Sequence, residues 1–319
     1  MKPSLKYALK QQWHRRVLPV AGVVGRADRP TRRVYDLILF NRELELLETR
    51  LHYLDPVVDV FVIGESAQTF IGEEKPLWFA QNRERFKKFE EKIRHVVIPP
   101  PEPQDYEMSY NATELKTTEI YHRRMLGRGL AGARGRDIVL SSDADEIPSR
   151  RSVEQLIGLM RLGYPAAIFQ MEWHLLYLNA VAAGYAESAH PSVWLGTAGT
   201  TMANFQNLFA GDANRLWQYR WGEMQKCLFR ITAGGWHFSF LGGLKRLAQK
   251  YRDNACRVRD PAELAGLRKH EIAHVRFEFR ELAGLFPAEL LEHLGPLQAL
   301  AGDEAQFQRE LAKYALGEI

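Results

Sequence analysis

The segment Asp143-Ala144-Asp145-Glu146-Ile147-Pro148 carries two aspartates separated by a single residue. Two carboxylates at this spacing on a turn can face one hard divalent cation and leave coordination positions open for phosphate oxygens. A cation such as Mn²⁺ or Mg²⁺ would there neutralise the charge of a departing diphosphate. Aspartates also recur in ordinary turns and at helix starts, so the pattern alone leaves a purely structural role open.

The elements that precede this acidic turn alternate between strand and helix. Residues 34–40 and 57–63 are apolar runs of strand length, and residues 44–54 between them place leucines at helical spacing. Together they predict a βαβ unit. Residues 94–98 and 137–142 are further expected strands, and the acidic turn directly follows the last of them. Open α/β sheets bind ligands beyond the carboxyl ends of their strands, so the position favours a binding role.

The second half of the chain is more irregular and rich in tryptophan. A strand is expected over residues 166–171, and helices around residues 244–251 and 287–316. Ser152-Val153-Glu154-Gln155 has the form of a capping box that opens a helix through Met160. We therefore predict an α/β fold with three parts, which are a basic N-terminal arm (1–33), a nucleotide- and metal-binding half (34–165) and an acceptor-binding half (166–319).

The overall composition is that of an ordinary globular protein, with 46% hydrophobic and 26% charged residues. The net charge is +4, and much of the excess lies in the first 33 residues. A folded nucleic-acid-binding domain would carry that charge on one face of its body, so we expect no nucleic-acid partner. The two cysteines, Cys227 and Cys256, exclude a disulfide framework, and a reducing compartment is the simplest interpretation.

Residues 5–18 combine apolar and basic positions. Leu5, Leu9, Trp13 and Val17 recur at helical spacing, with lysines and arginines elsewhere around the helix. Such a helix can lie on a membrane surface, or it can dock on the body of the protein with its polar side in water. No early apolar run reaches the roughly 20 residues of a membrane span. The sequence therefore predicts a cytoplasmic protein with a candidate peripheral membrane contact.

Several stretches in a fixed order resemble glycosyltransferase family 17. They cover about residues 34 to 255 and are Val34-Tyr35-Asp36, Phe40-Asn41-Arg42-Glu43, Arg50-Leu51, Val58-Asp59-Val60-Phe61-Val62-Ile63-Gly64-Glu65-Ser66, Thr69-Phe70 with Gly72, Lys75-Pro76-Leu77, Lys92-Ile93-Arg94-His95, Ser142-Asp143-Ala144-Asp145-Glu146-Ile147-Pro148 and Gly235-Trp236-His237-Phe238-Ser239. Each stretch is short, but their order and combined length make the resemblance specific.

The resemblance implies an inverting, metal-dependent transferase with a GT-A-like fold, a Rossmann-like and mostly parallel sheet flanked by helices. It also implies UDP-GlcNAc as donor and a glycan as acceptor. Animal members of the family are anchored by an N-terminal membrane helix, and no such helix is expected in this sequence. We therefore expect an acceptor glycan in the cytoplasm or at a membrane surface rather than a glycoprotein.

Three further site residues follow from the resemblance. His237, next to glycines that allow a close backbone approach, is implied as a third ligand beside Asp143 and Asp145. A packed core histidine is the alternative. Glu65 ends the second expected strand and should face the crevice, and Lys75 is a candidate phosphate or acceptor contact. For both, a surface salt bridge is the alternative.

An inverting transfer needs a general base that takes the proton of the acceptor hydroxyl. The sequence offers four candidates: Glu146, Glu172, Asp212 and Glu223. We favour Glu172, because it lies just past an expected strand of the acceptor half. Three tryptophans are candidates for stacking on sugar rings, although core packing is the commoner role of this residue: Trp173, Trp217 and Trp221.

Two other classes of protein remain as alternatives. A metal-dependent nucleotidyltransferase or phosphatase would use the same acidic turn, but the sequence has no glycine-rich loop of the P-loop kind. A non-catalytic glycan-binding protein of the same fold would keep the tryptophans and would not need Asp143, Asp145 and His237 intact.

Overall fold

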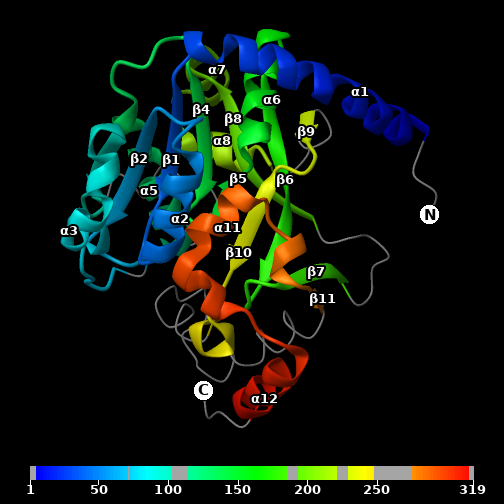
Figure 1. Cartoon of the computed structure of the whole chain (residues 1–319). Helices are drawn as coiled ribbons and strands as arrows, with labels where there is room; N and C mark the ends of the chain where they lie inside the picture. The colour runs from blue at the N-terminus through cyan, green and yellow to red at the C-terminus, as the bar shows by residue number, and fades with distance from the viewer. Residues whose placement is uncertain are drawn as a thin grey trace.

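The computed structural model describes residues 5–70, 72–102, 114–185, 193–220, 229–247 and 275–315. A single sheet runs through the described part of the molecule, with helices packed along it (Figure 1). Its strands follow the order β11-β7-β6-β8-β4-β1-β2-β3, and β5, β9 and β10 pair beside this path. The predicted α/β class is confirmed.

The first half of the chain forms the parallel part of the sheet. Its four strands are β1 (Val34–Leu39), β2 (Val60–Ser66), β3 (Ile93–Ile98) and β4 (Ile138–Asp143). All three pairings among them are parallel. Strands β1, β2 and β4 are buried on both faces, which explains their nearly continuous apolar sequence. Helix α2 (Leu44–Leu54) connects β1 to β2 as predicted.

The segment between β2 and β3 is helical but does not form one continuous α-helix. It forms a short helix α3 (Trp78–Gln81) followed by the 3₁₀ segment η2 (Arg83–Lys92). Phe86 and Phe89 are both buried. Residues three apart lie above one another in a 3₁₀ helix, so this form turns both rings to the core. Helix α5 (Glu114–Met125) and the 3₁₀ segment η3 (Leu126–Leu130) then lead to β4.

The second half of the sheet is mixed rather than parallel. Its strands are β5 (Glu146–Pro148), β6 (Ala166–Leu175), β7 (Ala180–Tyr185), β8 (Val193–Thr201), β9 (Phe229–Ile231), β10 (Gly235–Ser239) and β11 (Val275–Phe279). Strand β8 is antiparallel to both β4 and β6, whereas β9 and β10 run parallel to β6. The longer helices of this half are α7 (Met202–Phe209), α8 (Ala213–Gln218), α11 (Ala288–Leu294) and α12 (Glu304–Ala315).

Helix α6 (Arg150–Arg161) begins earlier than the predicted capping box. Ser149 is its N-cap, and the Ser149 hydroxyl accepts a hydrogen bond from the Ser152 amide. The N-terminal helix α1 (Leu5–Asp28) packs along α6 at very short range. A Cβ atom on Gly25 would lie 1.7 Å from the Glu154 carbonyl oxygen, so only glycine permits this approach.

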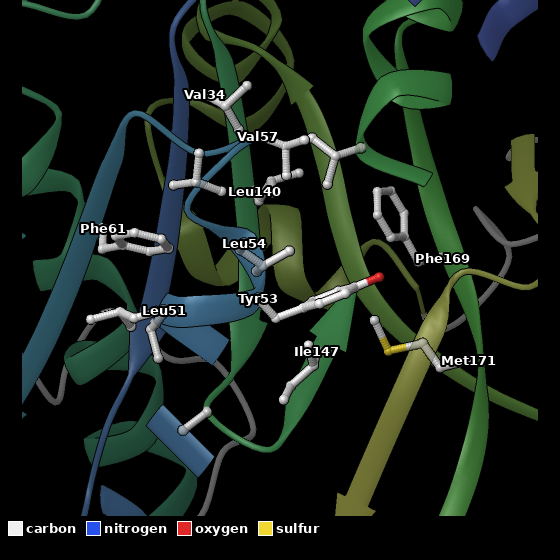
Figure 2. Close-up of a cluster of buried hydrophobic side chains, with 14 of the residues drawn as sticks. Val34, Leu51, Tyr53, Leu54, Val57, Phe61, Leu140, Ile147, Phe169 and Met171 are labelled. Carbon is white, nitrogen blue, oxygen red and sulfur yellow. The ribbon is translucent and has the colours of Figure 1, made fainter. Parts of the chain in front are cut away.

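Two hydrophobic clusters pack against the two faces of strand β1. Val34 and Ile38 belong to a cluster that also includes residues of α1, α2, α6 and α11, whereas Tyr35 and Leu37 belong to one with residues of η3, α7 and α8. Figure 2 shows side chains of the first cluster from both halves of the chain, such as Leu140 and Phe169. A common core therefore joins the halves on either side of residue 165. The division at that residue stays a prediction.

Candidate active site

The acidic turn lies where the sequence placed it, at the carboxyl edge of the parallel strands. Asp143 is the last residue of β4, and its position in the sheet is level with Leu39 of β1. The chain then turns into β5, which pairs with β10 so that Glu146 lies opposite His237. The Phe238 amide donates to the Asp145 carbonyl oxygen at 2.8 Å. Strand β10 therefore fixes the turn from the side of the second half.

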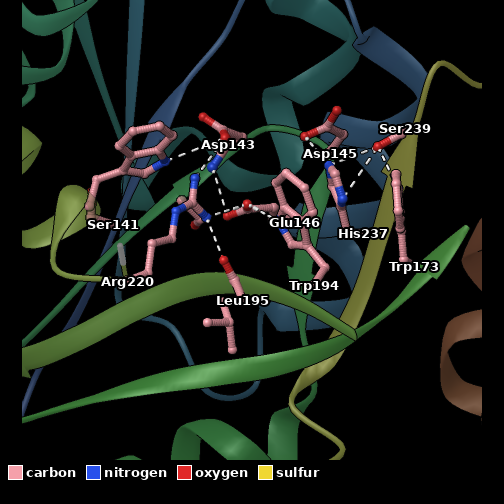
Figure 3. A network of polar contacts seen from close by, with 12 residues as sticks. Ser141, Asp143, Asp145, Glu146, Trp173, Trp194, Leu195, Arg220, His237 and Ser239 are labelled. Atoms are coloured by element: carbon pink, nitrogen blue, oxygen red, sulfur yellow. Dashed lines mark hydrogen bonds and ion pairs between the residues drawn. The ribbon is translucent and has the colours of Figure 1, made fainter. Parts of the chain in front are cut away.

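Asp145 and His237 are close together. The distance from His237 Nε2 to Asp145 Oδ1 is 3.6 Å, and the side chains are 6% and 11% exposed. The Trp194 ring stacks on the imidazole with a centroid distance of 4.1 Å, and the Ser239 hydroxyl lies within hydrogen-bond distance of the imidazole nitrogens. Figure 3 shows this group on one side of the turn. The structure thus brings together two of the three residues proposed to bind a metal.

Asp143 has different surroundings. Its Oδ1 accepts from Arg123 at 2.5 Å, and its Oδ2 accepts from Arg220 at 3.3 Å and from the Trp217 indole at 3.4 Å. Burial opposes the ionisation of Asp143, but the charges of Arg123 and Arg220 hold its pKa below the ordinary value. Both guanidinium groups lie over the Trp217 ring, at 3.8 and 4.0 Å from its centroid. Trp217 therefore makes two cation–π contacts in addition to its hydrogen bond to Asp143.

Glu146, one of the four candidate bases, is fully buried within the turn. Its Oε1 accepts from Arg220 at 2.5 Å and from the Trp194 indole at 2.7 Å. Its Oε2 accepts from the Asp143 amide at 3.2 Å. A carboxylate held in this way fixes the shape of the turn and the position of Arg220.

Arg50, on helix α2, holds the acidic turn through hydrogen bonds to its backbone. Its guanidinium forms a fully buried, bidentate pair with Asp36 of β1 at 2.7 and 2.8 Å. The same group donates to the Ser142 hydroxyl at 2.5 Å and to the carbonyl oxygens of Asp143 and Glu146. Asp36 and Arg50 stand in two of the stretches that carry the family resemblance, and their pairing gives these stretches a physical role.

Glu65 lies near the end of β2, as predicted, but its carboxylate is buried and bonded within the protein instead of facing a crevice. It accepts from the backbone amides of Phe79 and Ala80 at 2.8 and 3.3 Å and contacts His95 Nε2 at 3.2 Å. These bonds cap the start of α3. Lys75 lies in the loop after β2, where its backbone amide donates to the Ala67 carbonyl oxygen. In the described part of the chain, neither Glu65 nor Lys75 hydrogen-bonds to the acidic turn.

Glu172 is not brought together with His237. Strands β6 and β10 pair in parallel with Glu172 beside Trp236 and His237 beside Trp173. Neighbouring side chains in register share a face of the sheet, and successive ones alternate. Glu172 therefore faces away from His237, and it contacts His174 Nε2 at 3.1 Å. Its role as general base stays a prediction that this geometry does not favour.

The remaining candidates divide between described and undescribed residues. Asp212 caps helix α8 through the amides of Asn214 and Arg215, and its carboxylate also pairs with Arg124 at 2.8 Å. The indole of Trp173 donates to Ser239 at 2.9 Å, on the side of His237. Four residues named from the sequence lie outside the described residues: Trp221, Glu223, Cys227 and Cys256.

Sequence reasoning missed the arginines that surround the turn. Arg50 and Arg220 are fully buried, and Arg123 is 3% exposed. Arginine is almost never fully buried unless it is paired, but a single sequence does not show which arginines are buried. For Arg50, the signal was its place in a resembling stretch. For Arg123 and Arg220 the sequence held no comparable signal.

A divalent cation fits the Asp145 side of the turn better than the Asp143 side. Asp145 and His237 offer an oxygen and a nitrogen ligand at adjacent positions. Asp143 accepts three hydrogen bonds, and a carboxylate has about four lone-pair sites, so it has room for one more partner. Among the described residues, no group of three His, Cys, Asp or Glu side chains is arranged to hold a metal ion. The metal assignment stays a prediction.

Fold and site together define the class: this is an α/β protein with an acidic turn beyond the carboxyl ends of its parallel strands. The model of glycosyltransferase family 17 matches residues 19–177, which include β1 to β6 and the whole acidic turn. The resemblance noted in the sequence is thereby confirmed. His237 lies beyond the matched residues.

The curated relatives described next share the same enzyme name. The chain is 34% identical over 158 residues to the β-1,4-mannosyl-glycoprotein 4-β-N-acetylglucosaminyltransferases of Rattus norvegicus and Homo sapiens. Each alignment covers 44% of this chain and 28% of the relative. The chain thus matches less than a third of the length of these enzymes.

Solved structures resemble the chain more distantly. The 4-diphosphocytidyl-2C-methyl-D-erythritol synthase of Anaerococcus prevotii is 12% identical, with a TM-score of 0.34 over 65% of this chain and 89% of that chain. A mycobacterial protein is 15% identical, with a TM-score of 0.38 over 89% and 80%. Both scores are low, so the fold assignment rests on the sheet topology itself.

Proposed function

We propose that this protein is an inverting glycosyltransferase of the GT-A type, which transfers GlcNAc from UDP-GlcNAc to a glycan acceptor. The observation that carries the proposal is the acidic turn at the carboxyl edge of the sheet, inside the segment that matches glycosyltransferase family 17 and beside His237. The name of the curated relatives supports GlcNAc as the sugar.

Asp145 and His237, with Asp143, are the residues that would hold Mn²⁺ or Mg²⁺. A divalent cation in this position supplies charge neutralisation for a leaving nucleoside diphosphate. Arg123 and Arg220 lie against Asp143, so the proposed site holds fixed positive charge as well. The carboxylate of Asp143 offsets part of that charge and keeps both guanidinium groups in place.

The sugar is proposed to bind on the side of the turn that carries aromatic rings. Trp173 and Trp194 lie 5.8 Å apart between ring centroids, and Trp194 stacks on His237. Both tryptophans are partly exposed and on the same side as the imidazole. Such rings can bind the apolar face of a sugar next to the cation site.

Release of UDP from UDP-GlcNAc tests the proposal directly. With a mixture of N-glycan-type acceptors and Mn²⁺, we expect release of UDP that stops when a chelator is added. UDP-glucose, GDP-mannose and CMP-sialic acid serve as control donors and should release little nucleotide. Binding of glycan without release of UDP would favour a non-catalytic glycan-binding protein. Formation of pyrophosphate from a nucleoside triphosphate and a sugar phosphate would favour a nucleotidyltransferase.

A peripheral membrane contact is proposed for helix α1. No helix among the described residues is long and apolar enough to cross a membrane. Trp13, Val20 and Val23 are 59%, 55% and 71% exposed, although they are large and apolar. The Trp13 indole donates to the Tyr164 hydroxyl at 3.2 Å. Buried Leu18 and Ala21 occupy the side of α1 that packs against the body, so Val20 and Val23 form the outer face. That face can enter the headgroup region of a membrane.

Sedimentation with vesicles that contain anionic lipid tests this contact. We expect binding that weakens when Val20 and Val23 are both replaced by serine. The matched control replaces exposed Leu208 on α7 by serine. Equal sedimentation of the three proteins would remove α1 as the contact.

A further inference from the structure

Three nitrogen atoms beside the proposed site are buried without an acceptor. They are Lys75 Nζ, His122 Nε2 and Arg123 Nη1, and none has a hydrogen-bond partner in the part of the chain that the structure describes. His122 and Arg123 are 2% and 3% exposed. Buried polar groups in folded proteins nearly always have a partner, so three unpartnered nitrogens indicate a ligand. Lysine and arginine nitrogens only donate, and a histidine Nε2 donates when it carries the proton, so a ligand with acceptor atoms fits all three.

The three donors lie on elements that meet at the carboxyl edge of the sheet. His122 and Arg123 are neighbours in the last turn of α5, which packs against β2 and β3. Lys75 closes the loop that follows β2, and Phe70 of the same loop contacts the His122 ring at a centroid distance of 5.4 Å. Arg123 reaches the acidic turn through its other terminal nitrogen, which donates to Asp143. The cluster is therefore continuous with the proposed site.

Within the described part of the chain, neither Lys75 Nζ nor His122 Nε2 has a hydrogen-bond partner. Burial lowers the pKa of His122 to about 4, and the charges of Lys75 and Arg123 contribute to that lowering. Burial also lowers the pKa of Lys75, with Arg42 adding to the effect and Glu65 and Glu43 opposing it. The Glu65 carboxylate is already engaged by two backbone amides and His95. An incoming anion would favour the charged form of both side chains.

We propose that Lys75, His122 and Arg123 form an anion-binding position that takes a phosphate group beside the acidic turn. This inference rests on the proposed function, under which the phosphate belongs to the diphosphate of the nucleotide-sugar donor. A phosphate group offers several acceptor oxygens, and charge-assisted hydrogen bonds to phosphate are short and strong. The position would hold the diphosphate from the side opposite to Asp145 and His237, with Arg123 in contact with both the anion and Asp143.

The same chemistry has a second source, a phosphate carried by the acceptor. The two sources differ in what competes for the position. Inorganic pyrophosphate mimics the donor diphosphate without its base, whereas uridine carries the base without phosphate. Titration calorimetry with UDP, pyrophosphate and uridine, all in the presence of a chelator, therefore separates the contribution of this position from that of a metal.

Substitution of Lys75 and His122 gives the decisive comparison. We expect Lys75→Met and His122→Asn each to weaken pyrophosphate and UDP binding by about tenfold or more, because each removes one direct donor to the anion. The matched controls are Lys87→Met, at a 78% exposed lysine, and His52→Asn on α2, and both should bind as the wild type does. Thermal melts identify any variant that fails to fold, and Lys75→Met alone then carries the test.

A spectroscopic measurement adds a readout that a structural role would not change. Saturating pyrophosphate should raise the pKa of His122, followed by its ring resonances in NMR, and leave His52 unchanged. Unaltered pyrophosphate affinity in Lys75→Met, or an unchanged His122 titration, would overturn the proposal. Pyrophosphate binding that depends on Lys75, in a wild type that releases no UDP from UDP-GlcNAc, would uphold the anion position and reject the transferase. Competition by a phosphorylated glycan, but not by UDP, would reject the donor as the source.

Discussion

The two aspartates of the acidic turn are two residues apart, yet they have opposite surroundings. Asp143 is clamped between Arg123 and Arg220 and belongs to a rigid network of buried charges. Asp145 contacts His237 and borders a group of aromatic rings. The first carboxylate mainly keeps cationic side chains in position, and the second is the better placed to bind a metal. A repeated residue type in a motif therefore does not imply a repeated role.

The largest expected effect is a loss of stability when Arg50, on the Asp143 side of the turn, is replaced. Replacing Arg50 by methionine leaves Asp36 as an unpaired buried charge and frees two carbonyl oxygens of the turn. Loss of one partner of a buried pair typically costs about 3–5 kcal/mol of the free energy of unfolding. Denaturant unfolding of the Arg50→Met variant and the wild type measures this loss. Arg83→Met, which breaks an exposed pair with Glu90, is the control and should change stability by less than about 1 kcal/mol.

The burial of His122, beside Lys75 and Arg123, should appear in the pH dependence of stability. The pKa of His122 is lowered from 6.5 to about 4 in the folded protein, so the unfolded chain binds more protons between these values. Stability should therefore fall as the pH drops from about 7 to 4, by up to about 3 kcal/mol from this residue alone. The His122→Asn variant should lose that part of the acid sensitivity. Parallel unfolding curves of both proteins between pH 7 and 4 would contradict the prediction.

The two aspartates themselves provide the sharpest comparison. Asp145→Asn should lower transfer by about a hundredfold or more and change the melting temperature little, because it removes a proposed metal ligand but keeps the shape of the side chain. Asp143→Asn should lower both activity and melting temperature, because Arg123 and Arg220 lose their shared partner. Assays of UDP release and thermal melts on both variants decide the matter. Identical behaviour of the two variants would remove the distinction.

His237 should behave like Asp145. The His237→Ala variant is expected to lose about tenfold or more of the activity per folded molecule and to bind Mn²⁺ more weakly. A packed core residue would instead lower the melting temperature by several degrees and leave specific activity intact. Manganese titration and thermal melts on the same preparation separate these outcomes. Normal manganese affinity in a destabilised variant would confine His237 to packing.

The smallest effect is expected at Glu172, which faces away from His237. Glu172→Gln keeps the shape of the side chain and its hydrogen-bonding capacity toward His174, so turnover should stay within about twofold of the wild type. The measurement is the rate of UDP release across a pH range. A loss of a hundredfold, with the alkaline limb of the profile altered, would restore Glu172 as the general base.

Local pattern predicted the parallel half of the fold and the position of the acidic turn. Strands β1 and β2 are nearly continuous apolar runs, and α2 has one apolar stripe, so each can be predicted from its own residues. The pairing of β5 with β10 joins residues about 90 positions apart, and no local pattern encodes it. The same applies to the clamp formed by Arg50, Arg123 and Arg220, which exists only through tertiary contact.

The sequence also did not show on which face of the sheet a side chain lies. Glu172 was predicted to lie just past a strand ending at Met171, but that strand continues to Leu175. The residue therefore lies within the strand, where the neighbour in register decides its direction. A single sequence predicts alternation along a strand but not which of the two faces carries the site.

The close contact between α1 and α6 at their glycines affects how the protein would be placed on a membrane. The backbones of the two helices are in direct contact at Gly25 and Gly158, and this close packing favours a fixed position of α1 on the body. Helix α1 leads into the amino end of β1, whereas the acidic turn lies at the carboxyl end of the neighbouring β4 (Figure 1). A six-residue strand spans about 20 Å. A membrane bound at α1 would therefore lie about that distance from the site, and an acceptor attached to that membrane would need a spacer long enough to cover it.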